Sequence, residues 1–169
     1  MYSLTLGVWA IVAAYAILHD QYIVRIAPEH FTIYHGEMWG LTEPKALAAA
    51  WAFGSSWYPG ILLGMVCTLA ARADASVPRV AARDVLKSAA AVVCLVEASA
   101  AISGLIAHRL GHRLYPARFY HAPGVRLQLA QTIQLTSYWA SAVFSITLTF
   151  GLVAVRCLRR TPGAEKVVS

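Results

Sequence analysis

Residues 19–44 read HDQYIVRIAPEHFTIYHGEMWGLTEP and form a polar stretch between two apolar ones. Residues 2–18, YSLTLGVWAIVAAYAIL, precede it without a charged side chain, and residues 45–71 follow it with few polar positions. A helix needs about 20 largely apolar residues to cross a bilayer, so each flank is long enough for one crossing. The polar stretch is therefore predicted to connect two transmembrane helices.

The composition of the whole chain agrees with a lipid environment. Of its 169 residues 59% are hydrophobic and 13% are charged, whereas soluble domains are about a quarter charged. The net charge of +6 would favour nucleic acid in a soluble protein, but here the basic residues lie at the ends of apolar segments. We therefore expect the lipid bilayer as the partner, and no nucleic acid.

The apolar pattern predicts an all-α membrane protein, a four-helix transmembrane bundle in a single domain over residues 1–160. The four spans are expected at residues 2–21, 45–71, 88–107 and 127–155. Residues 22–44 and 108–126 form loops on one side, where they build a structured outer cap, and residues 72–87 form a loop on the other side. Residues 161–169 are expected to be a mobile tail. Two short runs have a strand-like alternation: Tyr22, Val24 and Ile26 alternate with Ile23 and Arg25, and Phe31, Ile33 and His35 alternate with Thr32 and Tyr34. They predict a short β-hairpin turning at Ala27 and Pro28.

The distribution of basic residues sets the expected orientation. Eight of the 14 Lys and Arg residues lie in residues 72–87 and after residue 155, and this excess places both termini in the cytoplasm. Cys67, Cys94 and Cys157 then lie toward the cytoplasmic side, where a reducing compartment keeps thiols free. They show no CxxC pair, so the sequence gives no sign of a zinc knuckle or a disulfide framework.

One acidic residue, Glu97, lies at the centre of the third predicted span. A charged carboxylate at that depth costs about 2.5 to 3.5 kcal/mol, so it needs a partner. Polar residues recur at helical spacing along one face of the fourth span, namely Gln131, Gln134, Tyr138, Ser141 and Ser145. We expect Glu97 to form a hydrogen bond with Tyr138 or Ser141. That bond either holds the helices together or belongs to a proton or cation path.

Histidine and carboxylate side chains gather in the predicted outer loops. His108 and His112 are four positions apart, the spacing by which a helix presents two metal ligands on one face. His19, Asp20 and Glu29 would complete a nitrogen and oxygen ligand set for a transition metal ion. The alternative is that these side chains anchor helix ends at the lipid headgroups.

Gly60 and Gly64 form a GxxxG pattern in the second predicted span. Glycines at this spacing let another helix approach closely. The approaching helix belongs either to this chain or to a partner, such as a second copy in a homo-oligomer.

Two short motifs carry a resemblance to a known family. His19-Asp20-Gln21 ends the first span, and Pro28-Glu29-His30-Phe31-Thr32 follows in the loop. The chain resembles a family of small uncharacterised bacterial four-span membrane proteins with His-Asp-Gln and Glu-Tyr-Phe-Thr in this loop. The resemblance implies a bacterial inner-membrane protein and points to His19, Asp20, Gln21, Glu29, Phe31 and Thr32, but it implies no activity.

Three functional hypotheses follow from these observations. The first is a non-catalytic or accessory membrane protein that acts through its outer loops and helix faces. The second is a metal-binding or metal-dependent membrane protein with its site in the outer cap. The third is a proton-coupled carrier or channel that uses Glu97. The sequence shows no GxSxG motif and no phosphate-binding loop, and it leaves open whether the protein is an enzyme.

Overall fold

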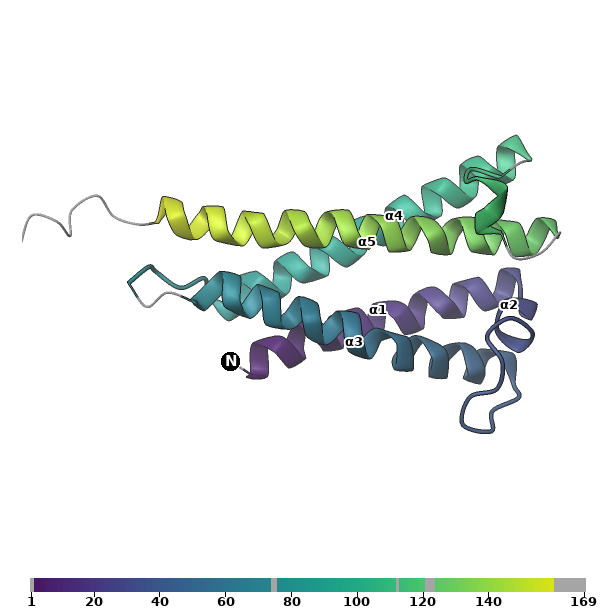
Figure 1. Ribbon diagram of the computed structural model, residues 1–169, viewed down its shortest axis with the longest axis horizontal. Helices are drawn as coiled ribbons and strands as arrows, with labels where there is room; N and C mark the ends of the chain where they lie inside the picture. Colours follow the sequence, from purple (N-terminus) through teal and green to yellow (C-terminus); the bar gives the residue numbers. More distant parts are fainter. Residues whose placement is uncertain (1, 74–75, 112, 121–123, 160–169) are drawn as a thin grey trace, which may run out of the picture.

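The computed structural model describes residues 2–73, 76–111, 113–120 and 124–159, and this part of the chain is helical and contains no strand (Figure 1). Its elements are α1 (Tyr2–Ile26), α2 (Glu29–Thr32), α3 (Pro44–Arg72), α4 (Ala82–Leu110), the short 3-10 helix η1 (Ala117–Phe119) and α5 (Val125–Leu158). The helices α1, α3, α4 and α5 are long and apolar enough to cross a membrane, and each includes one predicted span. His112 and the predicted tail 161–169 lie outside the described residues.

The four long helices run alternately up and down the bundle, as Figure 1 shows. α1 begins and α5 ends at one end of the bundle, which we call the terminal end. α2 and η1 lie at the other end, which we call the cap end. α1 packs mainly against α3, and α4 packs mainly against α5, so the molecule consists of two helix pairs.

Gly60 and Gly64 lie in the contact between α1 and α3. A Cβ atom added at Gly64 would lie 2.5 Å from the carbonyl oxygen of Thr5, and one added at Gly60 would lie 2.8 Å from Cδ1 of Trp9. Backbone and side-chain atoms of α1 therefore fill the space that a larger residue would need. The GxxxG pattern serves packing within the chain, and α1 covers the face that a partner would otherwise approach.

Two apolar clusters join the helix pairs, one toward each end of the bundle. The cluster at the cap end contains Ile23, Val24, Ala27, Phe31, Leu47, Ala48, Ala100, Leu127, Ala130 and Ile133. The cluster at the terminal end contains Leu4, Val8, Cys67, Ala71, Val80, Val85, Ala89, Leu148 and Leu152. The middle of the bundle lies between these clusters.

The predicted β-hairpin is wrong. α1 continues to Ile26, past the predicted end of the first span at residue 21, and α2 takes up part of the predicted second strand. Ile23, Val24 and Ala27 are all buried in the same cluster. A strand would place neighbouring residues on opposite faces, whereas helical spacing of three and four brings these three residues to one face. Burial of this face therefore favours the helix.

Candidate functional site

A cavity of about 860 Å³ lies between the two helix pairs. All four long helices line it, and most of its lining residues are apolar. Cavities that hold small molecules have volumes of about 300 to 1,000 Å³ and are lined mainly by apolar side chains with a few polar groups. The cavity in the middle of this bundle has the size and the character of such a site.

The cavity opens sideways between α3 and α5. Its exposed lining residues all belong to these two helices, and they include Leu62 of α3 at 49% and Tyr138 and Phe150 of α5 at 60% and 71%. The lining residues of α1 and α4 are buried or half-buried, so these two helices close the other side. The opening lies along apolar helices that are long enough to cross a bilayer, so it would face lipid.

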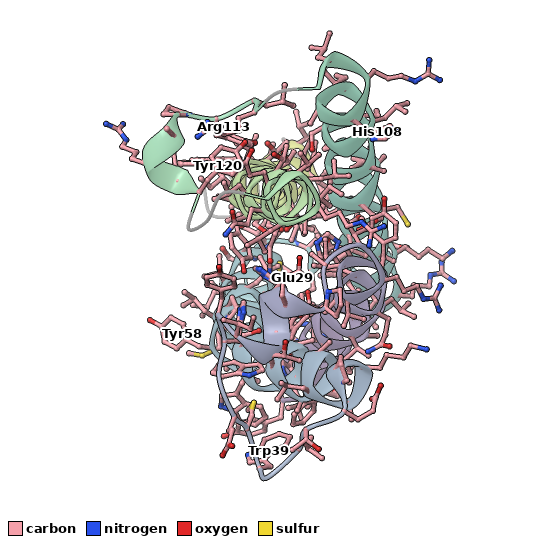
Figure 2. The ribbon with its side chains drawn as sticks, turned by 90° about the vertical axis from the view of Figure 1, so that its right-hand side faces the viewer. Glu29, Trp39, Tyr58, His108, Arg113 and Tyr120 are labelled. Atoms are coloured by element: carbon pink, nitrogen blue, oxygen red, sulfur yellow. The ribbon has the colours of Figure 1, made fainter. Side chains whose placement is uncertain are left out.

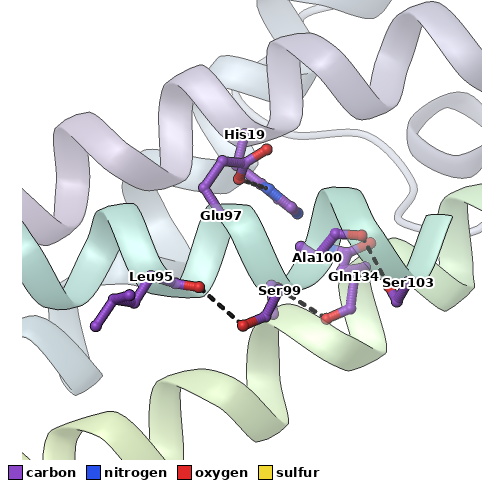
Figure 3. Close-up of polar contacts among 8 residues, drawn as sticks. His19, Leu95, Glu97, Ser99, Ala100, Ser103 and Gln134 are labelled. Carbon is purple, nitrogen blue, oxygen red and sulfur yellow. Dashed lines mark hydrogen bonds and ion pairs between the residues drawn. The ribbon is translucent and has the colours of Figure 1, made fainter. Parts of the chain in front are cut away.

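A side-chain contact between His19 and Glu97 joins α1 to α4 (Figure 3). His19 Nδ1 and Glu97 Oε2 are 2.7 Å apart, and the His19 side chain is 4% exposed whereas that of Glu97 is 39% exposed. The expected partners Tyr138 and Ser141 do not fill this role. Because α1 continues to Ile26, His19 lies about 10 Å inside the helix instead of in the cap, and there it reaches α4.

The second ring nitrogen of His19, Nε2, takes no part in the contact with Glu97. In an imidazole ring Nε2 points away from the group that Nδ1 contacts, and here Nε2 is therefore directed away from Glu97. His19 lines the cavity, and its buried Nε2 has no hydrogen-bond partner within the described part of the chain. The ring of Tyr15 packs beside the His19 ring at a centroid distance of 5.5 Å and also lines the cavity.

Asp20 is a second polar residue in the cavity wall. Its residue exposure is 7%, and no side chain in the described ranges forms a hydrogen bond or ion pair with it. A carboxyl group this deeply buried normally has a partner, because its charge loses solvation. A molecule in the cavity would lie within reach of Asp20.

The polar stripe of α5 also faces this cavity. Gln134, Tyr138, Ser141 and Ser145 line it, whereas Gln131 is buried outside the lining. Gln134 donates a hydrogen bond from Nε2 to the Tyr138 hydroxyl at 2.9 Å. Its carbonyl oxygen Oε1 is buried and has no partner among the residues that the structure describes.

The residues predicted to bind a metal ion lie in different places. His19 and Asp20 are in the cavity wall, Glu29 begins α2, and His108 is exposed on α4, apart from Glu29 at the cap end (Figure 2). Within residues 2–73, 76–111, 113–120 and 124–159, no three His, Cys, Asp or Glu side chains form a group that could hold a metal ion.

Several residues of the site were not predicted from the sequence. Tyr15, Ser55, Ser56 and Ser137 line the cavity but belong to no motif. The partner of Glu97 could have been predicted from the sequence. An acidic residue at mid-span needs a polar neighbour, and His19 is an ionisable residue at the end of the first predicted span.

Four helices that are long and apolar enough to cross a membrane indicate the class of multi-pass membrane proteins. Comparison of the chain with protein-family models, curated proteins and solved structures gives no match.

Proposed function

We propose that this chain is a membrane protein that binds a small amphiphilic molecule in the cavity between its two helix pairs. One observation carries the proposal: three residues of the cavity wall, Tyr15, His19 and Gln134, each have a buried polar atom without a partner among the described residues. An unsatisfied buried polar atom costs about 1 to 3 kcal/mol. A bound molecule that forms hydrogen bonds with these atoms removes that cost.

The apolar part of the cavity fits the other half of such a molecule. It is formed by the side chains of Val12, Leu62, Leu63, Val66, Val92, Val93 and Ile146. A ligand that comes from the bilayer gains packing contacts with these side chains, because lipid tails are as apolar as the cavity wall. The sideways opening lets a molecule dissolved in the bilayer enter without first passing through water.

Equilibrium dialysis tests this function with two probes of the same size, 2-(1-naphthyl)ethanol and 2-(1-naphthyl)ethylamine. The protein is placed in nanodiscs of a zwitterionic lipid, and empty nanodiscs measure partition into the lipid. We expect at least one probe to bind saturably at about one molecule per chain. A Val93→Trp variant should lose this binding, because the indole fills part of the cavity.

The matched control is Leu95→Trp. Leu95 lies on α4 two positions further on, is 51% exposed and does not line the cavity. Its indole would extend into lipid, so this variant should bind the probe as the unmodified protein does. Binding of neither probe above the level of empty nanodiscs, or equal loss in both variants, would contradict the function.

The proposed function is compatible with the accessory role predicted from the sequence, and it requires no bond to be made or broken in the cavity. We also propose that the protein lies in a bacterial inner membrane with both termini in the cytoplasm. The excess of basic residues near the terminal end and the family resemblance of the first loop support this assignment.

Proton-coupled transport is a second candidate, favoured by the His19–Glu97 pair. Glu97 is half-exposed beside the closed side of the cavity, and His19 lies between it and the cavity. An imidazole can pass a proton between its two nitrogens. Proton movement in liposomes that carry a gradient of the bound probe would test this candidate, and a Glu97→Gln variant that moves protons equally would argue against it.

A further inference from the structure

We infer that the polar group of the bound molecule is a protonated amine, so that the cavity selects lipophilic ammonium ions. The inference rests on the proposed binding function and specifies the class of ligand. The polar residues of the cavity wall form some hydrogen bonds within the protein. The inference follows from the donors and acceptors that remain available to a ligand.

Four hydroxyl groups of the wall have already used their protons. Each donates to a backbone carbonyl three or four positions earlier in its own helix, at distances between 2.8 and 3.3 Å. These residues are Ser55, Ser56, Ser137 and Thr149. A hydroxyl that has donated its proton keeps only acceptor capacity. The four groups can therefore accept hydrogen bonds from a ligand but cannot donate to it through the same protons.

Gln134 and Asp20 add two further acceptors. The amide nitrogen of Gln134 donates to Tyr138, which leaves the buried oxygen Oε1 as the free atom. The carboxyl group of Asp20 when ionised can only accept. In the described part of the chain no lysine or arginine lines the cavity, and the neighbouring imidazole of His19 is already paired with Glu97. The hydroxyl groups of Tyr15 and Tyr138 in the wall can still donate, so the unpaired carboxyl group of Asp20, and not the number of acceptors alone, favours a ligand with a positive charge.

A primary ammonium group supplies what this wall lacks. It presents three N–H donors and one positive charge, and it carries no acceptor that would meet the oxygens of the wall. A charge-assisted hydrogen bond to Asp20 is stronger than a neutral one. The rings of Tyr15 and Tyr138 in the wall offer additional contact for a cation. A carboxylate head group would instead meet Asp20 with the same charge.

The deciding experiment compares three probes with one naphthalene ring and different head groups. They are 2-(1-naphthyl)ethylamine, 2-(1-naphthyl)ethanol and 1-naphthylacetate, each measured by equilibrium dialysis against protein in zwitterionic nanodiscs and against empty nanodiscs. We expect the ammonium probe to bind at least about tenfold more tightly than the alcohol, the range expected for a hydrogen bond to a charged group. The carboxylate probe should bind most weakly.

Asp20→Asn tests the assigned counter-ion, and Asp84→Asn is its control. Both changes keep the side-chain size and remove one negative charge, but Asp84 lies in the first turn of α4 outside the cavity. Asp20→Asn should reduce affinity for the ammonium probe about tenfold and leave the alcohol unchanged. Asp84→Asn should change neither affinity.

The outcomes separate the inference from the proposed function. Equal binding of alcohol and ammonium, or an Asp20→Asn variant that keeps the ammonium affinity, would overturn the amine while leaving a binding cavity. Absence of binding by all three probes would overturn both. If Asp20→Asn does not fold, the ranking of the three probes on the unmodified protein still decides the matter.

Discussion

His19 Nδ1 lies 2.7 Å from Glu97 Oε2, and this contact joins residues 78 positions apart on two different helix pairs. The pair stabilises the approach of α1 and α4, and it also leaves the other nitrogen of His19 for the cavity. One contact thus connects the packing of the bundle with the proposed binding site.

A double-mutant cycle tests the pair. We expect His19→Leu and Glu97→Leu each to lower the free energy of unfolding by about 1 to 2 kcal/mol, because each leaves the other polar group without its partner. The double variant should lose less than the sum of the two, with a coupling of about 1 kcal/mol. Unfolding by sodium dodecyl sulfate in mixed micelles, followed by circular dichroism, measures these values, and additive losses would speak against the contact.

The glycine contact between α1 and α3 gives a second prediction. Gly64→Ala should destabilise the protein by about 1 to 3 kcal/mol, because the new Cβ would lie 2.5 Å from the backbone oxygen of Thr5 and the two helices must separate. Gly151→Ala is the control, since a Cβ there meets no described atom within 4 Å. The same unfolding assay should show no loss for Gly151→Ala. Equal effects of the two changes would be evidence against close packing at Gly64.

Much of the fold follows from features that depend on one segment at a time. Four long apolar runs predict the four long helices, because the length and composition of each run decide whether it can cross a bilayer. The steps of three and four between Gln134, Tyr138 and Ser141 predict that they share a face, and all three line the cavity.

The remaining features depend on several segments at once. The residues from Tyr22 to Ile26 are too few for their hydrophobic period to distinguish a strand from a helix. The helix is favoured because Ile23 and Val24 are buried together, which depends on the neighbouring helices. The partner of Glu97 depends on where α1 ends and how it meets α4. The cavity depends on the side-chain volumes of four helices together, and no single segment predicts it.

A buried arginine at the terminal end gives a third prediction. Arg156 is 7% exposed. Its guanidinium group donates hydrogen bonds to the carbonyl oxygens of Ala70, Val77 and Pro78 at 3.2 to 3.4 Å. Arg156→Leu leaves these oxygens without their donor and should cost about 2 kcal/mol of unfolding free energy. The exposed Arg159→Leu is the control and should cost less than about 0.5 kcal/mol. Limited proteolysis should show faster cleavage between α3 and α4 only in Arg156→Leu, and no difference would contradict the role of Arg156.

The fourth prediction concerns the connection between α4 and α5 at the cap end. The Tyr120 hydroxyl accepts a hydrogen bond from the Tyr115 amide at 3.2 Å and lies 2.8 Å from Thr132 Oγ1. Since Thr132 donates its own proton to a backbone carbonyl of α5, the Tyr120 hydroxyl is the donor to Thr132. Tyr120→Phe removes both bonds and should loosen the connection by about 1 kcal/mol.

Hydrogen exchange measured by mass spectrometry would detect this loosening. The Tyr115 amide loses its acceptor in Tyr120→Phe, so peptides that contain it should exchange several-fold faster, as a change of about 1 kcal/mol in a local opening equilibrium requires. Tyr58→Phe is the control, because Tyr58 is 77% exposed on α3, far along the chain from this connection. Tyr58→Phe also removes a hydroxyl group, but it should leave the exchange of residues 113–120 unchanged. Unchanged exchange in Tyr120→Phe as well would show that the connection is held by contacts other than the Tyr120 hydroxyl.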